Sequence, residues 1–408
     1  QIFDDAFVEK FAFDVLDPTK LIPEEEVPVK MVGRLVLDRV VDNAFAETEQ
    51  VAFCPQNIIP GIDFSDDPLL QGRTFSYHDT QQHRLGTTNF NQLEINAPRC
   101  PIHNFAQDGV AARLDRQPKG RVNYEPNSWG GPRENPHVGF QSYAEPLSGT
   151  KQRLRPESFA DHYSQARQFF ISQTKTEQMH MANAFVFELS KIKRADIRER
   201  VISHLLNVDK SLAQQVAEGL GIEAMPAPAK AAVAPKQAIQ PSDALSIVNN
   251  APKTFKGRKV GVLLSDNCDS TLFKAVKAAV EAEGAKVAVI APKIAGVKGD
   301  NGKLIPVDEK IDGGPSVLFD AVVLLPSAEA AATFKDEPAP RDFVSDAFAH
   351  CKFIGYADSA MPLLAALGLD KKLDGGFVKL VDAGDAEVYV QACRALRFWE
   401  REASLDKK

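Results

Sequence analysis

Hydrophobic and polar residues follow a different pattern in each successive part of this chain. Within residues 1–55, Phe11, Phe13 and Val15 alternate with smaller or polar residues, and the run MVGRLVLDRV at 31–40 is rich in aliphatic side chains. Both features are typical of β-strands, in which alternate side chains face opposite sides. The first segment is therefore predicted to form strands, which by themselves would leave unpaired edges in need of a partner.

A helix is predicted to follow, beginning at Pro68. Asp66 or Asp67 can act as its N-cap, and proline suits the first turn because its missing amide hydrogen has no helical partner there. Arg73 and Tyr77 are four residues apart, so their side chains share one face of the helix. The guanidinium and the phenol are thus expected to lie within reach of each other.

Three different patterns occupy the middle of the chain. Residues 87–156 are polar and contain many prolines, and so long a connection is uncommon in a compact domain unless it wraps around something or mediates assembly. Residues 157–221 have apolar side chains at three- and four-residue spacing, which predicts helices in three stretches: SFADHYSQARQFFISQ, TKTEQMHMANAFVFELSKI and RADIRERVISHLLNVDKSLAQQVAEGLG. Residues 222–256 are dominated by Pro, Ala and Lys, which predicts an extended, semi-rigid linker.

The last segment, residues 257–408, alternates short continuous apolar runs with amphipathic stretches. RKVGVLLS, AKVAVIAP, FDAVVLLP and KFIGYA are predicted to be buried strands, and TLFKAVKAAVEAEG a helix that ends at Gly284. Strands without polar alternation are typical of parallel sheets that carry helices on both faces. A parallel α/β domain of the flavodoxin kind is therefore predicted.

Composition narrows the classes of function. The net charge of −7 argues against nucleic acids and anionic membranes as partners, since both favour clustered Lys and Arg. No apolar run approaches the roughly 20 residues that a membrane-spanning helix needs. The five cysteines are scattered and none belongs to a CxxC pair. This usage suits a reducing, cytoplasmic compartment and argues against a disulfide framework or a zinc site.

The Arg73–Tyr77 pair could supply a metal ligand. A free phenol titrates near about 10, and a neighbouring cation lowers that value by favouring the phenolate, a hard anionic ligand suited to ferric iron. On spacing alone, an RxxxY pair is more often a buried tyrosine beside a surface arginine. The surrounding sequence decides between these two interpretations.

RTFSYHDTQQHRLG at 73–86 closely resembles the proximal haem helix of haem catalases, which has the pattern RxFxYxDTxxxRLG. Other segments resemble catalase segments in catalase order: DPTKLIP at 17–23, DNAFAETEQVAF at 42–53, PGIDFSDDPLLQGR at 60–73, CPIHNFAQDG at 100–109 and NYEPNS at 123–128. Together with the long extension after residue 220, they resemble the large-subunit branch of that family. Catalases are known for haem held by a tyrosine, so this ligand is carried over from the resemblance.

The resemblance implies a haem cofactor, of the b type or a modified d type, and hydrogen peroxide as substrate, disproportionated to water and dioxygen. Tyr77 would be the proximal iron ligand, and Arg73 would keep its oxygen deprotonated. Haem contacts are carried over to Phe53, Leu69, Arg73, Ser76, Tyr77, Thr80, Gln81 and Arg84. Arg84 could pair with a haem propionate.

Cys54 has two interpretations. In some large-subunit catalases a His or Cys at the corresponding position is joined covalently to the β-carbon of the axial tyrosine. A Cys54–Tyr77 bond is therefore one prediction, and a buried, unreacted thiol is the other.

The architecture that the resemblance implies is multidomain, α+β and α/β. Residues 1–86 would hold the last strands of an antiparallel catalase β-barrel and the proximal haem helix, and 87–156 a loop that wraps across subunits of a homotetramer. Residues 157–221 would form the helical region, 222–256 the linker, and 257–408 a flavodoxin-like domain that resembles type 1 glutamine amidotransferases.

In catalases a histidine and an asparagine from the amino-terminal half build the peroxide-facing side of the haem. None of the eight histidines here lies in a segment that resembles that one. The amino-terminal half is therefore expected to be absent from this chain and to be required for activity. The alternative is an inactive fragment, or an assembly and stabilisation module without haem.

The carboxyl-terminal domain is not expected to be a hydrolase or an amidotransferase. Enzymes of that superfamily hold a nucleophilic Cys on the turn after a strand such as KFIGYA, where this chain has Ala357. Cys351 precedes the strand, and Ser359 is a weak substitute without a visible His–Asp arrangement. Thiol chemistry at Cys268 or Cys351 is left as a third possibility.

The glycine-rich run GVKGDNG at 296–302 is predicted to lie in a hairpin. Phosphate-binding glycines belong to a strand-to-helix turn, so phosphate binding is not expected there.

Overall fold

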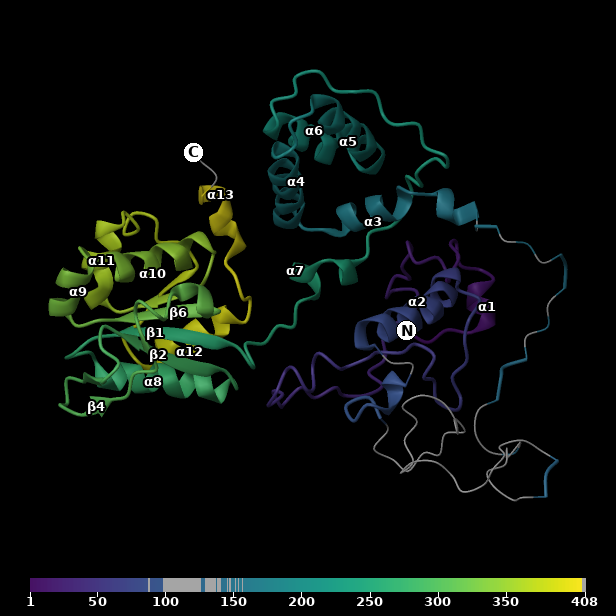
Figure 1. The fold of residues 1–408 in the computed structure, drawn as a ribbon. Helices are drawn as coiled ribbons and strands as arrows, with labels where there is room; N and C mark the ends of the chain where they lie inside the picture. Colours follow the sequence, from purple (N-terminus) through teal and green to yellow (C-terminus); the bar gives the residue numbers. More distant parts are fainter. Residues whose placement is uncertain are drawn as a thin grey trace. The chain divides into compact units, whose positions relative to one another are not determined.

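The computed structural model describes most of the chain, namely residues 1–86, 89–97, 126–128, 137, 141–144, 146, 148–150, 152, 154–155 and 157–405. The predicted wrapping loop at 87–156 lies largely outside the described residues. The chain divides into two compact units, residues 1–171 with 192–244, and residues 172–191 with 245–408. Figure 1 shows the helices and strands of both.

The helix α2 (Pro68–Leu85) confirms the helix that was predicted to carry Arg73 and Tyr77. Asp67 caps it by accepting a hydrogen bond from Leu69 N at 2.8 Å, and Pro68 occupies the first turn. The helix ends at Gly86, whose φ of 68° lies in the left-handed region that favours glycine. Local capping residues therefore determine where this helix begins and ends.

The strands predicted over residues 1–55 are not formed by the chain alone. Within residues 1–67, all of which are described, the only regular element is the short helix α1 (Asp5–Val8). A strand is stabilised by hydrogen bonds to a neighbouring strand, and this segment has none beside it. Its aliphatic side chains stay exposed: Val29, Met31, Val32, Leu35, Val36, Leu37 and Val40. The catalase barrel itself stays a prediction.

The helical region contains four α-helices, which occupy the three stretches of helical periodicity. They are α3 (Ser164–Ser172), α4 (Lys175–Ser190), α5 (Ala195–Val208) and α6 (Lys210–Gly219). Asp209 divides the third predicted stretch, because its backbone is extended and its carboxylate caps α6 by accepting a hydrogen bond from Ser211 N at 2.8 Å.

The predicted linker is extended over residues 222–242, but Asp243–Leu245 form a 3-10 turn and Ile247–Asn250 form a short helix, which the prediction missed. The first part of the linker is also not a free tether. Within residues 222–244, Ala229 N donates to Ser203 O at 2.9 Å, and Lys236 N donates to Ser164 Oγ at 2.8 Å. Extended backbone must find partners for its polar groups, and here the neighbouring helices supply them. This part of the linker therefore belongs to the fold of the first unit.

Residues 257–405 contain a six-stranded, parallel sheet. Its strands are β1 (Lys259–Leu264), β2 (Lys286–Ala291), β5 (Glu309–Lys310), β6 (Ala321–Leu325), β7 (Ile354–Tyr356) and β8 (Phe377–Lys379). The spatial order is β5-β2-β1-β6-β7-β8, with every neighbouring pair parallel. Without the edge strand β5 this is the order 2-1-3-4-5, one of the common doubly wound arrangements.

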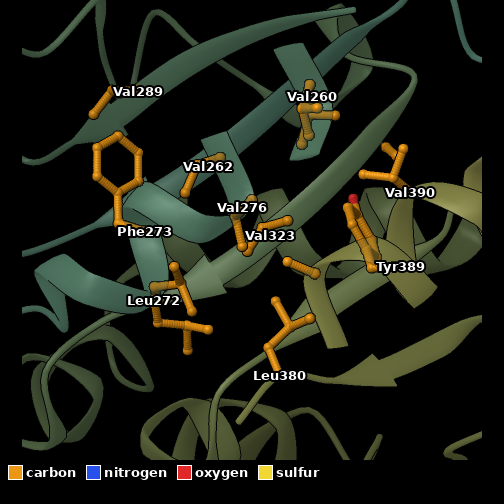
Figure 2. Packing of buried hydrophobic residues seen from close by; sticks show 14 of the residues in the cluster. Val260, Val262, Leu272, Phe273, Val276, Val289, Val323, Leu380, Tyr389 and Val390 are labelled. Atoms are coloured by element: carbon orange, nitrogen blue, oxygen red, sulfur yellow. The ribbon is translucent and has the colours of Figure 1, made fainter. Parts of the chain in front are cut away.

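Helices cover both faces of this sheet. They are α8 (Ser270–Ala282), α9 (Ala328–Phe334), α10 (Pro338–Ala349), α11 (Met361–Ala366), α12 (Ala383–Cys393) and the short α13 (Glu402–Leu405). The short helix α7 (Ile247–Asn250) contributes no residue to either core. Alternate residues of β1 face opposite cores: Val260 and Val262 pack with α8 and α12, as Figure 2 shows, and Leu263 packs with α9, α10 and α11. Continuous apolar strands predict such a two-sided core.

Two further sequence predictions concern the glycine-rich run and membrane-spanning helices. The glycine-rich run at 296–302 belongs to the antiparallel hairpin of β3 (Val297–Lys298) and β4 (Leu304–Ile305), as predicted. None of the described helices is long and apolar enough to cross a lipid bilayer.

Lys352 is a charged group buried in this core. It is 2% exposed, and its Nζ donates to Ser316 O at 2.5 Å and to Phe319 O at 2.6 Å. Burial lowers the pKa of Lys352 to about 8, from an ordinary value of 10.5. Between these two pH values the unfolded protein therefore binds more protons than the folded protein does.

We expect the free energy of unfolding to rise with pH through this window, and between pH 7 and 9 Lys352 alone should contribute about 1 kcal/mol of this rise. The measurement is the difference in urea-unfolding free energy between the wild-type protein and Lys352→Met, from pH 7 to 9. The pH range ends at 9 because two buried thiols affect stability at higher pH. Burial raises the pKa of Cys268 to about 11 and that of Cys393 to about 12, and both shifts lower the free energy of unfolding as the pH rises further. Parallel pH profiles of the two proteins would contradict the expectation.

Candidate functional site

Tyr77 lies half-buried on α2, in contact with two other side chains. The Arg73 guanidinium carbon lies 5.2 Å from the centre of the Tyr77 ring, as the helical spacing predicted. The Phe53 ring meets Tyr77 edge to face, with centroids 5.6 Å apart and an interplanar angle of 75°. The positive charge thus lies over the aromatic face of Tyr77, where the ring quadrupole attracts it.

Gln81 and Arg84 hold the segment that carries Phe53 against α2. Gln81 is 6% exposed, and its Nε2 donates to Phe53 O at 3.2 Å. Arg84 Nε donates to Gln81 Oε1 at 3.1 Å, and the two Nη groups donate to the carbonyls of Glu49 and Val51. In this structure both side chains bind the chain's own backbone, and their predicted haem contacts stay predictions.

Asn96 completes this arrangement, although no sequence motif identified it. Its Oδ1 accepts a hydrogen bond from Ala52 N at 2.8 Å, and its Nδ2 donates to Gln50 O at 2.8 Å and to Phe90 O at 2.9 Å. The side chain therefore fixes the backbone just before Phe53. Two of its three partners, Ala52 and Gln50, lie more than 40 residues away in sequence, so no local pattern reveals this role.

Apolar side chains beside Tyr77 are uncovered. Phe53 is 60% exposed and Leu69 on α2 is 51% exposed. Ser76 and Thr80 are also exposed on this helix. Exposed apolar surface that adjoins a polar group often marks a binding site. The site thus offers one phenol, one guanidinium and an open apolar surface.

Models of known families match three successive parts of the chain. The model described as Catalase matches residues 1–131, Catalase-related immune-responsive matches 156–220, and the C-terminal domain found in long catalases matches 256–403. Each of these models describes a part of catalases, so the chain is similar to catalases along most of its length.

Individual relatives match the chain along its whole length. Catalase C of Rhizobium meliloti (strain 1021) is 58% identical over 409 residues, which cover 100% of this chain and 58% of that protein. Catalase HPII of Pseudomonas putida is 43% identical, with 100% of this chain and 57% of that protein covered. Catalase-2 of Bacillus subtilis (strain 168) is 39% identical, with 98% and 58% covered. The chain thus spans less than two thirds of the length of these relatives.

The residues around Tyr77 fit the haem that the catalase family implies. Iron needs an anionic or neutral donor, which the phenol oxygen can supply, and a porphyrin needs flat apolar surface, which Phe53 and Leu69 leave open. Arg73 places a positive charge over the ring that carries this oxygen. The Catalase model matches the chain from residue 1 onward. This match does not test whether the amino-terminal catalase half lies outside the chain, which stays a prediction.

Cys54 is a free, buried thiol in this structure. Its Sγ lies 3.8 Å from Gln56 Oε1. The Cys54–Tyr77 bond stays a prediction.

The catalase-type carboxyl-terminal domain presents no thiol on the turn after β7, among residues that are all described. Ala357 occupies that turn, and Cys351, 3% exposed, precedes the strand. Burial raises the pKa of Cys351, and burial raises the pKa of Cys268 to about 11. Buried thiols that stay protonated are poor nucleophiles, which weakens the possibility of thiol chemistry in this domain.

Proposed function

We propose that this chain supplies the proximal, haem-holding side of an enzyme that disproportionates hydrogen peroxide to water and dioxygen. The observation that carries the proposal is the position of Tyr77, half-buried between Arg73 and Phe53 beside uncovered apolar side chains. The similarity to catalases over the whole chain supports it.

Haem, when bound, supplies the iron at which peroxide is first reduced and then oxidised. Tyr77 would hold the iron through its phenol oxygen, and the Arg73 charge over the ring would favour the anionic form of that ligand. Phe53 restrains the Tyr77 ring by its edge contact, and Gln81 fixes the Phe53 backbone. Leu69 and Phe53 would provide apolar surface for the porphyrin and exclude water there.

Peroxide disproportionation also needs an acid–base group on the opposite side of the haem. We assign this group to amino-terminal catalase sequence outside the chain. The same sequence would pair with residues 29–40 as strands of the catalase barrel and cover the aliphatic side chains that are exposed there. A homotetramer, in which residues 87–156 wrap across subunits, and a cytoplasmic location are further parts of the proposal.

The test is a haem titration of the chain, with and without an amino-terminal catalase fragment, followed by the Soret band and by oxygen release from peroxide. We expect turnover only in the mixture. Haem bound by the mixture without turnover would favour an inactive fragment. The absence of haem binding in both samples would contradict the proximal assignment and favour an assembly module without haem.

A further inference from the structure

A cavity of about 340 Å³ opens at the carboxyl edge of the parallel sheet. It is lined by residues 265–267 after β1, residues from 292 to 297 after β2, and residues from 327 to 337 after β6. The chain passes from β1 to β2 on one side and later places β6 on the other side of β1. The strand order therefore reverses at this edge, and in open α/β sheets ligands bind at such a reversal.

Hydrogen bonds within the chain fix the floor of this cavity. Ser265, 4% exposed, accepts a hydrogen bond from Ser327 N at 2.8 Å, which ties the end of β1 to the start of α9. Asn267 N donates to Lys298 O at 2.7 Å and so ties the β1 turn to the hairpin. A wall joined at these points is already formed before a ligand arrives, as is usual for small-molecule sites.

Anions are poorly suited to this cavity. Phosphate groups at this edge of a sheet are usually bound by a glycine-rich turn and by free amide groups at a helix N-terminus. Here the turn has the sequence SDNCDS, without glycine. Asp269 already accepts hydrogen bonds from Thr271 N at 2.9 Å and Leu272 N at 2.8 Å at the start of α8. The chain's own carboxylate thus fills the position that a phosphate would take.

The charges that line the cavity favour a cation. Asp266, Glu329 and Glu337 contribute three carboxylates, and Lys293 contributes one ammonium group, which leaves a net charge of −2. A concave surface of one sign concentrates ligands of the opposite sign. The volume lies at the lower end of the range for small-molecule sites. We infer that this cavity binds a small polyamine, a function separate from the proposed haem site.

The test is calorimetric titration of the full chain with spermidine at low salt. We expect saturable binding to one site that weakens as sodium chloride is raised, because the attraction between charges is screened. The double variant Glu329→Gln, Glu337→Gln should bind at least ten-fold more weakly. Lys293→Met should bind more tightly, since a like charge is removed. The control is Glu387→Gln, which removes an exposed carboxylate on α12, outside the cavity, and should leave affinity unchanged.

Three outcomes would overturn the inference: no saturable heat with spermidine, a loss in the double variant no larger than in Glu387→Gln, or weaker binding by Lys293→Met. Inorganic phosphate that competes with spermidine at the same site would also overturn it. Thermal unfolding of each variant separates lost binding from lost folding. Haem content is measured independently, so failure here leaves the proximal haem assignment untouched.

Discussion

Replacing Tyr77 by Phe is expected to abolish haem retention. The substitution removes one oxygen atom and keeps the ring, so the edge contact with Phe53 and the cation–π contact with Arg73 can persist. What is lost is the only donor that we assign to the iron from this side. The measurement is Soret absorbance per protein after gel filtration, in the chain assembled with an amino-terminal catalase fragment, and we expect at least a ten-fold decrease.

Tyr163→Phe is the matched control for this experiment. The Tyr163 hydroxyl is hydrogen-bonded to His204 Nδ1 at 2.8 Å, in the same compact unit but on a different element from α2. The Tyr163→Phe variant loses the same atom, a phenol oxygen, and should retain haem at the wild-type level. An undiminished Soret band in Tyr77→Phe would show that the iron ligand is misassigned, and equal losses in both variants would point to general damage to the fold.

Sequence features that lie within a single helix or strand predicted the structure well. The cap at Asp67, the proline after it and the glycine at the far end together define α2, and all three are local. The spacing of Arg73 and Tyr77 brings them together because they are one helical turn apart. The continuous apolar runs of the last domain predicted its strands because a buried parallel strand needs no polar alternation.

Predictions failed where the outcome depends on distant partners. The aliphatic run at 31–40 has strand composition, yet without a neighbouring strand its backbone forms no ladder. Asn96 and Gln81 fix the backbone around Phe53 through hydrogen bonds that span many residues of sequence. The break at Asp209 was different, since an acidic N-cap residue inside the third helical stretch was a local signal that went unused.

The second large effect is expected from the ion pair that anchors the carboxyl-terminal segment. Arg401 is 1% exposed, and its Nε and Nη2 each donate to the Asp374 carboxylate at 2.8 Å. Its Nη1 donates to Lys352 O at 2.7 Å. The guanidinium carbon lies 4.7 Å from the Phe348 ring centre and 4.9 Å from that of Phe377. The charge is thus enclosed by rings, with one carboxylate to balance it.

Asp374→Ala leaves this guanidinium buried without its counter-charge. Breaking a buried pair from one side costs about 3–5 kcal/mol, and we expect the lower end because the Asp374 side chain is 26% exposed. The measurement is urea unfolding followed by circular dichroism. Asp358→Ala is the control, since its partner Lys379 lies 2.8 Å away with both side chains exposed, and no measurable loss is expected. If the two variants lost the same stability, the aromatic rings and the Lys352 carbonyl would suffice to stabilise Arg401, and Asp374 would contribute orientation alone.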